Sequence, residues 1–449
     1  MAESMDPKTF DNISAAGGRA DGVACAAWHA LFWLVFANCV GVGIAVLLLF
    51  PMLNLQLGEW TYGRWIMVHM NLELYGWTTL PLVGFLFRVY GADRAPAAVW
   101  CRPVVWMWSA VLCVGVVSWL FGNSSGKMFL DWSGYARIFF IGALLVLWLL
   151  LLFSLLAGWR QGRVKGVTAL GVRLPGLGIL LAVPLAMYYA STPGVYPPFN
   201  PDTGGPTGAS QLESSLAVVM LLLLLPFAIA DRKPEHTRIV SISWMVLAME
   251  AVLCAAMGRG SISHHVPSQY LSLGSILVWL PLTPLYYAAF GWHGNTRRWR
   301  LSFLWWWSAL LITGWVFFLP GVLDHFKFTD GLVGHSFVAM AGFASSLMIF
   351  VMVQLLGESG RIFSRPRAFF LWHGSVIAYV VLMTVAGWRE GGDPAFTIVP
   401  GLARNSLYTL RLVSGIAMLL ASLDWLLDAT ALRGERASFS DSWAMEKTA

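Results

Sequence analysis

The stretch IGALLVLWLLLLFSLL, residues 141–156, carries no charged side chain and lies within an apolar run that begins near Gly134. A helix needs roughly 20 apolar residues to cross a hydrocarbon core of about 30 Å. Only helices and closed barrels satisfy the backbone inside a bilayer, and an unbroken run of this length excludes a barrel strand. The run therefore predicts a transmembrane helix.

Similar apolar runs recur along the whole chain, and their number decides the fold class. Composition agrees, because 58% of the residues are hydrophobic and 12% are charged, against about 45–50% and about 25% in soluble domains. The prediction is an all-α integral membrane protein of about 12 transmembrane helices. The membrane domain spans residues 26–428, between tails at 1–25 and 429–449, and no repeat of convincing similarity is evident. The other runs begin near Ala26, Tyr62, Ala98, Thr168, Ser210, Thr237, His264, Leu301, Leu332, Ala368 and Arg404.

Lysine and arginine residues are concentrated in alternate connections between these runs. The long connection from Ser191 to Ser210 has none. By the positive-inside rule the basic connections and both termini are cytoplasmic, in a multi-pass protein of the inner (cytoplasmic) cell membrane. The formal charge of +6 then reflects topology and contact with membrane lipid, and no nucleic-acid partner is expected. The basic groups are Arg88, Arg94 and Arg102; Arg160, Arg163 and Lys165; Arg232 and Lys233; Arg297, Arg298 and Arg300; and Arg361, Arg365 and Arg367.

Five ionisable side chains gather at one depth in this topology. Such residues are costly inside a membrane, which makes each a functional candidate. His69 lies roughly 10 Å below the outer surface at about 1.5 Å per residue. Glu213, the pair His264 and His265, and His335 also fall in the outer third of the membrane. Imidazole is a common ligand of haem iron and copper, and carboxylates can complete an iron site.

Each candidate also has a structural interpretation. His69 and His335 could equally be hydrogen-bonded packing residues. The histidine pair is also compatible with a polar surface loop, and Glu213 could equally stabilise a helix dipole. Glu73 and Glu250 suit either proton relay or hydrogen bonding between helices, and His325 suits contact with a haem propionate.

Three short motifs strengthen the metal interpretation. They are SHHVPSQYLSLG at 263–274, TDGLVGH at 329–335, and His69-Met70-Asn71. In their joint placement the chain resembles subunit I of the heme-copper oxidase superfamily and is most similar to its cbb-type branch. The resemblance covers helix count, order and membrane side over nearly the whole chain.

The resemblance implies a role for each candidate ligand. His69 would bind a low-spin haem, and His335 would be the proximal ligand of a high-spin haem. His264 and His265, with Glu213 in place of the family's third histidine, would hold a second metal facing that haem. This metal is copper in oxidases and iron in nitric oxide reductases, and oxygen or nitric oxide is reduced between the two centres. His335, His264 and His265 would then form the catalytic set.

The chain departs from the family at two ligand positions. Phe337 takes the place of the second low-spin haem ligand, and Glu213 replaces a histidine. Two histidines with a carboxylate suit non-haem iron better than copper, so the expected cofactors are one or two b-type haems with copper, iron or no second metal.

Three hypotheses about function stay open. The first is a reductase of oxygen or nitric oxide, and the second is a non-catalytic haem-bearing or structural partner subunit of a respiratory complex. The third is a cofactor-free transporter. Because the chain has no CxxCH site for covalent haem, any cytochrome c function would come from separate cytochrome c subunits.

Overall fold

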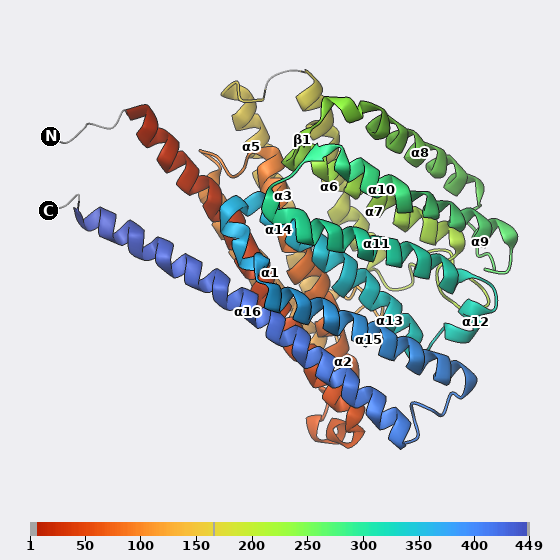
Figure 1. Ribbon diagram of the computed structural model, residues 1–449. Helices are drawn as coiled ribbons and strands as arrows, with labels where there is room; N and C mark the ends of the chain where they lie inside the picture. The colour runs from red at the N-terminus through yellow and green to blue at the C-terminus, as the bar shows by residue number, and fades with distance from the viewer. Residues whose placement is uncertain (1–6, 165–166, 447–449) are drawn as a thin grey trace. The chain divides into compact units, whose positions relative to one another are not determined.

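The computed structural model describes residues 7–164 and 167–446, and this part of the chain is helical almost throughout (Figure 1). Within it, 11 helices are long and apolar enough to cross a membrane. The chain is therefore an all-α, multi-pass membrane protein, as the apolar runs predict. The candidate spans are Gly22–Leu49, Ala98–Leu120, Gly134–Arg160, Arg173–Ala190, Gly208–Ile229, Pro234–Ala256, Pro267–Ala288, Gly294–Phe318, Asp330–Ser364, Pro366–Gly392 and Leu402–Ala431.

The remaining predicted span is helical in three consecutive segments. It consists of α2 (Tyr62–Asn71), a π-helical segment (Leu72–Thr78) and α3 (Thr79–Tyr90). The same construction recurs in α13 (Asp330–Phe337), a π-helical segment (Val338–Ala344) and α14 (Ser345–Leu356). π-Helical turns are rare and are frequently found at functional sites.

Several observed helices begin at the residues expected from sequence. The starts predicted at Tyr62, Ala98, Gly134 and Thr237 coincide with helix starts, while the run expected from His264 becomes helical only at Pro267. The further helices are α1 (Pro7–Leu49), α4 (Ala98–Leu120), α5 (Gly134–Arg160), α6 (Val167–Ala190), α7 (Gly208–Ile229), α8 (Thr237–Ala256), α9 (Pro267–Leu273), α10 (Trp279–Ala288), α11 (Arg297–Phe318), α12 (Val322–Phe326), α15 (Pro366–Gly392) and α16 (Leu402–Glu446). Two short strands, β1 (Asp231–Arg232) and β2 (Phe290–Gly291), pair antiparallel.

The predicted tails are partly helical. Within the segment 1–25 helix α1 begins at Pro7, and within 429–449 helix α16 continues to Glu446. Residues 1–6 and 447–449 lie outside the described residues, as does Lys165 of the predicted basic connections.

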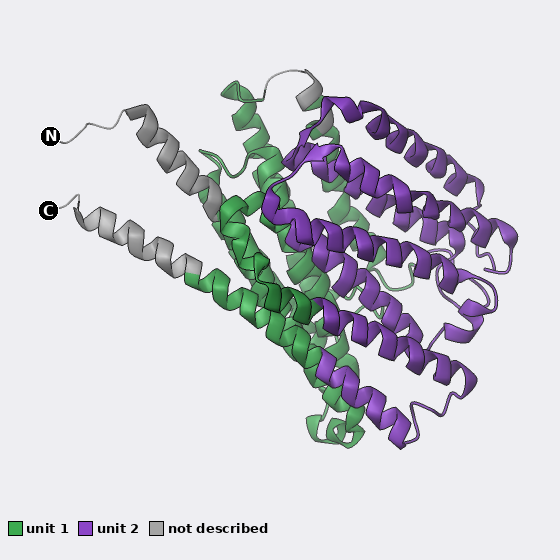
Figure 2. Cartoon of the chain, viewed as in Figure 1, with its two compact units in different colours: residues 1–195, 351–372, 415–449 green, residues 196–350, 373–414 purple. Residues whose placement is uncertain are grey.

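The chain forms two compact units (Figure 2). Unit 1 contains residues 1–195, 351–372 and 415–449, and unit 2 contains residues 196–350 and 373–414. Unit 1 includes α1, α2 and α3, and unit 2 includes α11 and α13.

The two units share a packing arrangement around a tryptophan and a glycine. In unit 1 a Cβ at Gly76 would lie 2.6 Å from the Cβ of Trp33. In unit 2 a Cβ at Gly342 would lie 2.5 Å from Cδ2 of Trp306. Each glycine belongs to a π-helical segment, and each tryptophan belongs to the long helix packed against that segment. The absence of a side chain at these two positions is what allows each pair of helices to approach so closely.

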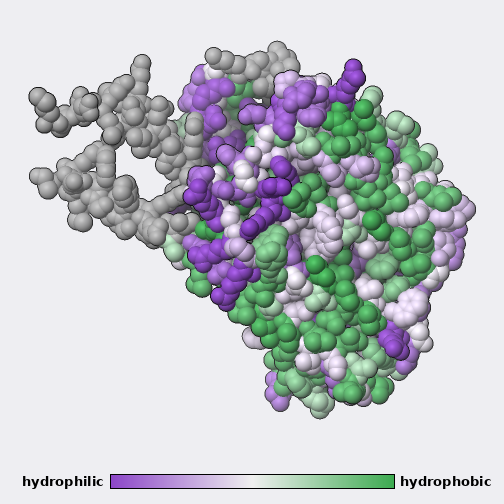
Figure 3. Space-filling view, viewed as in Figure 1, coloured by the Kyte–Doolittle hydropathy of each residue, from purple (hydrophilic) through white to green (hydrophobic). Residues whose placement is uncertain are grey.

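The outer surface is rich in apolar side chains. On α11, Leu301, Trp305 and Ile312 are exposed. The space-filling view shows extensive hydrophobic surface along the helices, with hydrophilic residues gathered in separate patches (Figure 3). Apolar area on this scale suits contact with lipid, because soluble monomers rarely expose large contiguous apolar patches.

Candidate functional site

His69 is held against helix α1 in a defined tautomer. Its Nδ1 lies 2.9 Å from the carbonyl oxygen of Ala37. A carbonyl can only accept a hydrogen bond, so Nδ1 carries the proton and Nε2 carries the lone pair. A Cβ at Gly41 would lie 2.9 Å from Cε1 of the ring, so the ring reaches α1 only because residue 41 is glycine. Metal-binding histidines usually donate their second ring N–H to such an acceptor.

His335 is held in the same way against helix α11. Its Nδ1 lies 3.1 Å from Oγ1 of Thr313, whose hydroxyl donates to the carbonyl of Ala309 at 2.7 Å. The Thr313 oxygen therefore accepts from Nδ1, and Nε2 of His335 again carries the lone pair. The ring lies over Gly314, where a Cβ would be 3.5 Å from Cε1, and packs edge-on against Phe317.

Both histidines stand at the same place relative to a π-helical segment. The segment at Leu72 begins three residues after His69, and the segment at Val338 begins three residues after His335. Sequence reasoning missed this correspondence. A signal was present, because each histidine is followed by a glycine seven residues later and each contacting helix carries a tryptophan eight residues before its own glycine.

Phe337, where the resemblance implies a histidine, is part of an aromatic stack. Its ring centroid lies 3.7 Å from that of Tyr379, and the two planes differ by 16°. A phenyl ring offers no ligand atom, so this position contributes packing to unit 2 and no coordination.

The adjacent histidines lie in a turn between α8 and α9. Gly258, with φ +84°, follows the end of α8, and Pro267 starts α9. In a regular helix successive side chains diverge by about 100°, whereas here the two ring centroids are 4.2 Å apart. This irregular backbone lets His264 and His265 present their rings together.

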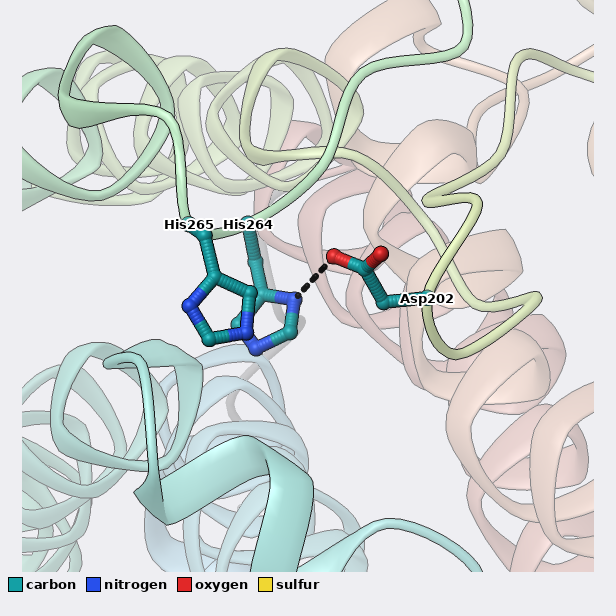
Figure 4. Close-up of side chains that lie close together, drawn as sticks. All are labelled: Asp202, His264 and His265. Atoms are coloured by element: carbon teal, nitrogen blue, oxygen red, sulfur yellow. Dashed lines mark ion pairs between the residues drawn. The ribbon is translucent and has the colours of Figure 1, made fainter.

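Two aspartates complete a polar group around the histidine pair. Nδ1 of His264 lies 2.9 Å from Nδ2 of Asn200 and 3.5 Å from Oδ2 of Asp202 (Figure 4). On the other side of the ring, Nε2 of His264 lies 3.0 Å from Oδ1 of Asp324. Nε2 of His265 lies 3.2 Å from Oδ2 of the same carboxylate. Asp324 therefore faces both imidazoles.

Local structure holds both aspartates in place. The backbone N–H of Asp202 donates to Oδ1 of Asn200, and the Ser263 hydroxyl donates to Oδ2 of Asp202. The backbone N–H of Gly321 donates to Oδ2 of Asp324 at 2.7 Å. Burial alone would raise the pKa of Asp324, but hydrogen bonds from Gly321 and His264 and the charges of His264 and His265 lower it overall. The carboxylate is thus kept ionised.

The side chains around His264 and His265 include two aspartates, whereas the sequence predicts Glu213 as the acidic ligand. Ligand atoms of Asp202, His264 and His265 all lie within 4.8 Å of one another. This group does not include Glu213, which is an exposed residue of α7 within electrostatic range of Cys254. Asp202 and Asp324 went unpredicted because Asp202 lies in a connecting segment and Asp324 lies in the short helix α12, between predicted spans, where an acidic residue by itself carries no signal.

Two of the other polar candidates, Glu250 and His325, have local partners. Glu250 is buried and accepts a hydrogen bond from the indole N–H of Trp279. Nε2 of His325 lies 3.1 Å from the carbonyl oxygen of Trp388. Glu73 belongs to the first π-helical segment. Glu250 and His325 thus each contact another residue of unit 2, and their predicted roles stay predictions.

Comparison with known protein families and with curated proteins finds no match to this chain. Its class is therefore defined by fold and side-chain geometry. The chain is an all-α, multi-pass membrane protein in which His69 and His335 are hydrogen-bonded to neighbouring helices, while His264 and His265 face carboxylates.

Proposed function

We propose that this chain is a haem-binding redox protein of the cytoplasmic membrane, related to subunit I of the cbb-type heme-copper oxidases, in which His69 and His335 each bind haem iron through Nε2. One observation carries the proposal. In each unit a histidine donates its Nδ1–H to a neighbouring helix, lies over a glycine and precedes a π-helical segment.

The donor chemistry of both histidines fits an iron ligand. Neutral imidazole with its proton on Nδ1 presents the Nε2 lone pair that haem proteins use. Acceptors at Ala37 and Thr313 orient the rings and increase the basicity of Nε2. A bound haem supplies iron that alternates between ferrous and ferric states and so carries single electrons.

The same geometry favours this proposal over a cofactor-free transporter. A histidine that merely packs in a helix bundle has no need of a close-fitting glycine and a fixed tautomer, yet both features occur at His69 and again at His335. Phe337 stands where the family sequence has the second histidine ligand of the low-spin haem, and its phenyl ring offers no ligand atom. This supports an electron-transfer or partner subunit at least as well as a complete reductase.

The copper centre that the resemblance implies does not fit the residues around His264 and His265. Copper in this family takes three histidines, whereas the pair here is flanked by the carboxylates of Asp202 and Asp324. The catalytic form of the proposal, reduction of oxygen or nitric oxide, therefore rests on His335 and is tested by activity.

The direct test is haem content of the purified chain. Pyridine-haemochrome assay and a reduced-minus-oxidised spectrum should show b-type haem, with one fewer haem per chain in His69→Ala and in His335→Ala. The exposed His236 provides the matched control, because His236→Ala should keep the wild-type content. A wild-type protein that purifies without haem would refute the proposal, and the cofactor-free transporter would be the remaining hypothesis.

Two further readouts separate the forms of the proposal. A reductase consumes oxygen or nitric oxide and loses turnover in His335→Ala, whereas a partner subunit keeps its haem, shows no turnover alone and co-purifies with cytochrome c subunits. Retained turnover in His335→Ala would exclude the reductase form.

A further inference from the structure

We infer that His264, His265 and Asp324 form a water-accessible binding site for a divalent first-row metal ion of the zinc, manganese or iron(II) class, with Asp202 orienting His264. This site takes the place of the buried three-histidine copper centre that the family resemblance implies. It does not depend on whether the chain binds haem.

The first argument is the carboxylate that faces a fully buried imidazole. His264 is fully buried, and its Nε2 lies 3.0 Å from Oδ1 of Asp324, with no other partner for this nitrogen within the described structure. A ring nitrogen and a carboxylate oxygen that face each other in this way can share a metal ion in place of a proton. A metal ion between Nε2 and the carboxylate satisfies both groups.

The second argument is the spacing of the ligand atoms. Oδ1 of Asp324 lies 3.0 Å from Nε2 of His264 and 3.4 Å from Nε2 of His265. Ligands about 2.1 Å from a metal are separated by about 3.0 Å along an octahedral edge and about 3.4 Å along a tetrahedral edge. Both distances from the Asp324 oxygen are therefore of the size found between ligand atoms that share one metal ion.

The third argument is the acceptor behind His264. When Nε2 binds a metal, Nδ1 must carry the proton, and Oδ2 of Asp202 lies 3.5 Å from Nδ1 to accept it. Without metal, Nδ2 of Asn200 donates to Nδ1. Loading the site therefore removes the proton from Nε2, places one on Nδ1 and requires the Asn200 amide to turn away from the ring. The arrangement of carboxylate, histidine and metal is the usual one in protein metal sites.

The exposure of two of the ligand side chains and the chemistry of the three donor groups limit which metal ion fits the site. The side chains of His265 and Asp324 are 52% and 39% exposed, so water can occupy the remaining coordination positions. Two imidazoles with a carboxylate form a borderline to hard donor set, suited to zinc, manganese or iron(II) and poor for copper(I). The geometry points to an open site that holds a partly hydrated divalent ion.

The experiment is a metal titration of the full chain in detergent after chelator treatment. Zinc should bind at one ion per chain by elemental analysis, cobalt(II) should give ligand-field absorption, and excess zinc should raise the thermal midpoint. His264→Ala, His265→Ala and Asp324→Asn should each weaken zinc binding by more than 100-fold. Asp202→Asn should weaken it about 10–100-fold, as expected for an outer-shell carboxylate.

Two controls make the outcome decisive. Glu213→Gln removes the acidic residue predicted from sequence, and His325→Ala removes a neighbouring histidine whose ring lies against Trp388. Both should bind zinc like the wild type. His264→Gln serves as a second variant if His264→Ala fails to fold. Haem content should be unchanged in every metal-site variant, which separates this test from that of the proposed function.

Either of two results would overturn the inference. One is the absence of stoichiometric zinc or cobalt in the wild type. The other is unchanged affinity in folded Asp324→Asn and His264→Gln. If zinc binding weakens in Glu213→Gln and is unchanged in Asp324→Asn, the acidic ligand is Glu213, as predicted from sequence.

Discussion

The glycine beneath His69 offers the sharpest test of the proposed haem ligand. In Gly41→Ala the new Cβ would lie 2.9 Å from Cε1 and 3.2 Å from Nδ1 of His69. Carbon atoms in good contact are about 3.5–4.0 Å apart. The imidazole must therefore move by more than half an ångström, and this displacement pulls Nδ1 away from the carbonyl of Ala37.

The expected loss of stability follows from three contributions. Overpacking costs about 1–3 kcal/mol, and the lost hydrogen bond costs about 0.5–1.5 kcal/mol. Alanine recovers about 0.5–1 kcal/mol relative to glycine inside a helix. The free energy of unfolding should thus fall by about 0.5–4 kcal/mol, and haem at His69 should be lost or show a shifted spectrum.

Gly43 provides a matched control on the same helix. A Cβ there meets nothing within 4 Å, so Gly43→Ala should gain about 0.5–1 kcal/mol. Unfolding in mixed micelles, followed by circular dichroism, measures both variants, and the Soret band reports on haem. Equal stability and equal haem content in Gly41→Ala and Gly43→Ala would refute the reasoning.

Three other predictions address packing, pH and the second histidine. In Gly342→Ala the new Cβ would lie 2.5 Å from Trp306, whereas in Gly374→Ala the new Cβ would meet nothing within 4 Å. The thermal midpoint should fall clearly in Gly342→Ala only, because overpacking costs about 1–3 kcal/mol. Burial raises the pKa of Asp131 above its ordinary value of 3.8, against the hydrogen bond from Asn71. The contribution of protonated Asp131 to the free energy of unfolding is therefore complete below about pH 3.8 and is lost as the pH rises through the raised pKa of the folded state. Asp131→Asn should abolish this decline and be at least as stable as the wild type at pH 7, and a steeper decline in the variant would contradict the assignment. Thr313→Val removes the acceptor for Nδ1 of His335 and should weaken haem binding, measured by haem titration, about 10–100-fold. Thr384→Val is the control, because its hydroxyl donates to the carbonyl of Val380, and this variant should bind haem like the wild type.

Helix positions were largely predictable because they depend on local composition. An apolar run of about 20 residues has few alternatives in a chain of this hydrophobicity, and α4, α5 and α8 begin at the predicted residues. Helix ends were less predictable, since polar residues such as Arg297 and Asp330 extend the helices beyond the apolar runs.

The candidate site was predictable in its histidines and not in its acids. His264 and His265 stood out because two adjacent histidines between glycines and a proline predict a turn with both rings available. Asp324 comes from the connection before α13, and Asp202 comes from the stretch before α7. Their meeting with the histidines depends on how unit 2 folds, which no local pattern expresses.

The sequence by itself determined that this is a multi-pass helical membrane protein and that His69, His335 and the histidine pair are its candidate ligands, because apolar length and costly buried imidazoles are properties of single segments. Tertiary structure decided the rest. The proton on Nδ1 of His69 and of His335 is set by an acceptor on another helix. The choice of Asp202 and Asp324 over Glu213 is set by which connecting segments meet. Both depend on contacts between distant residues, and such contacts exist only once the helices pack.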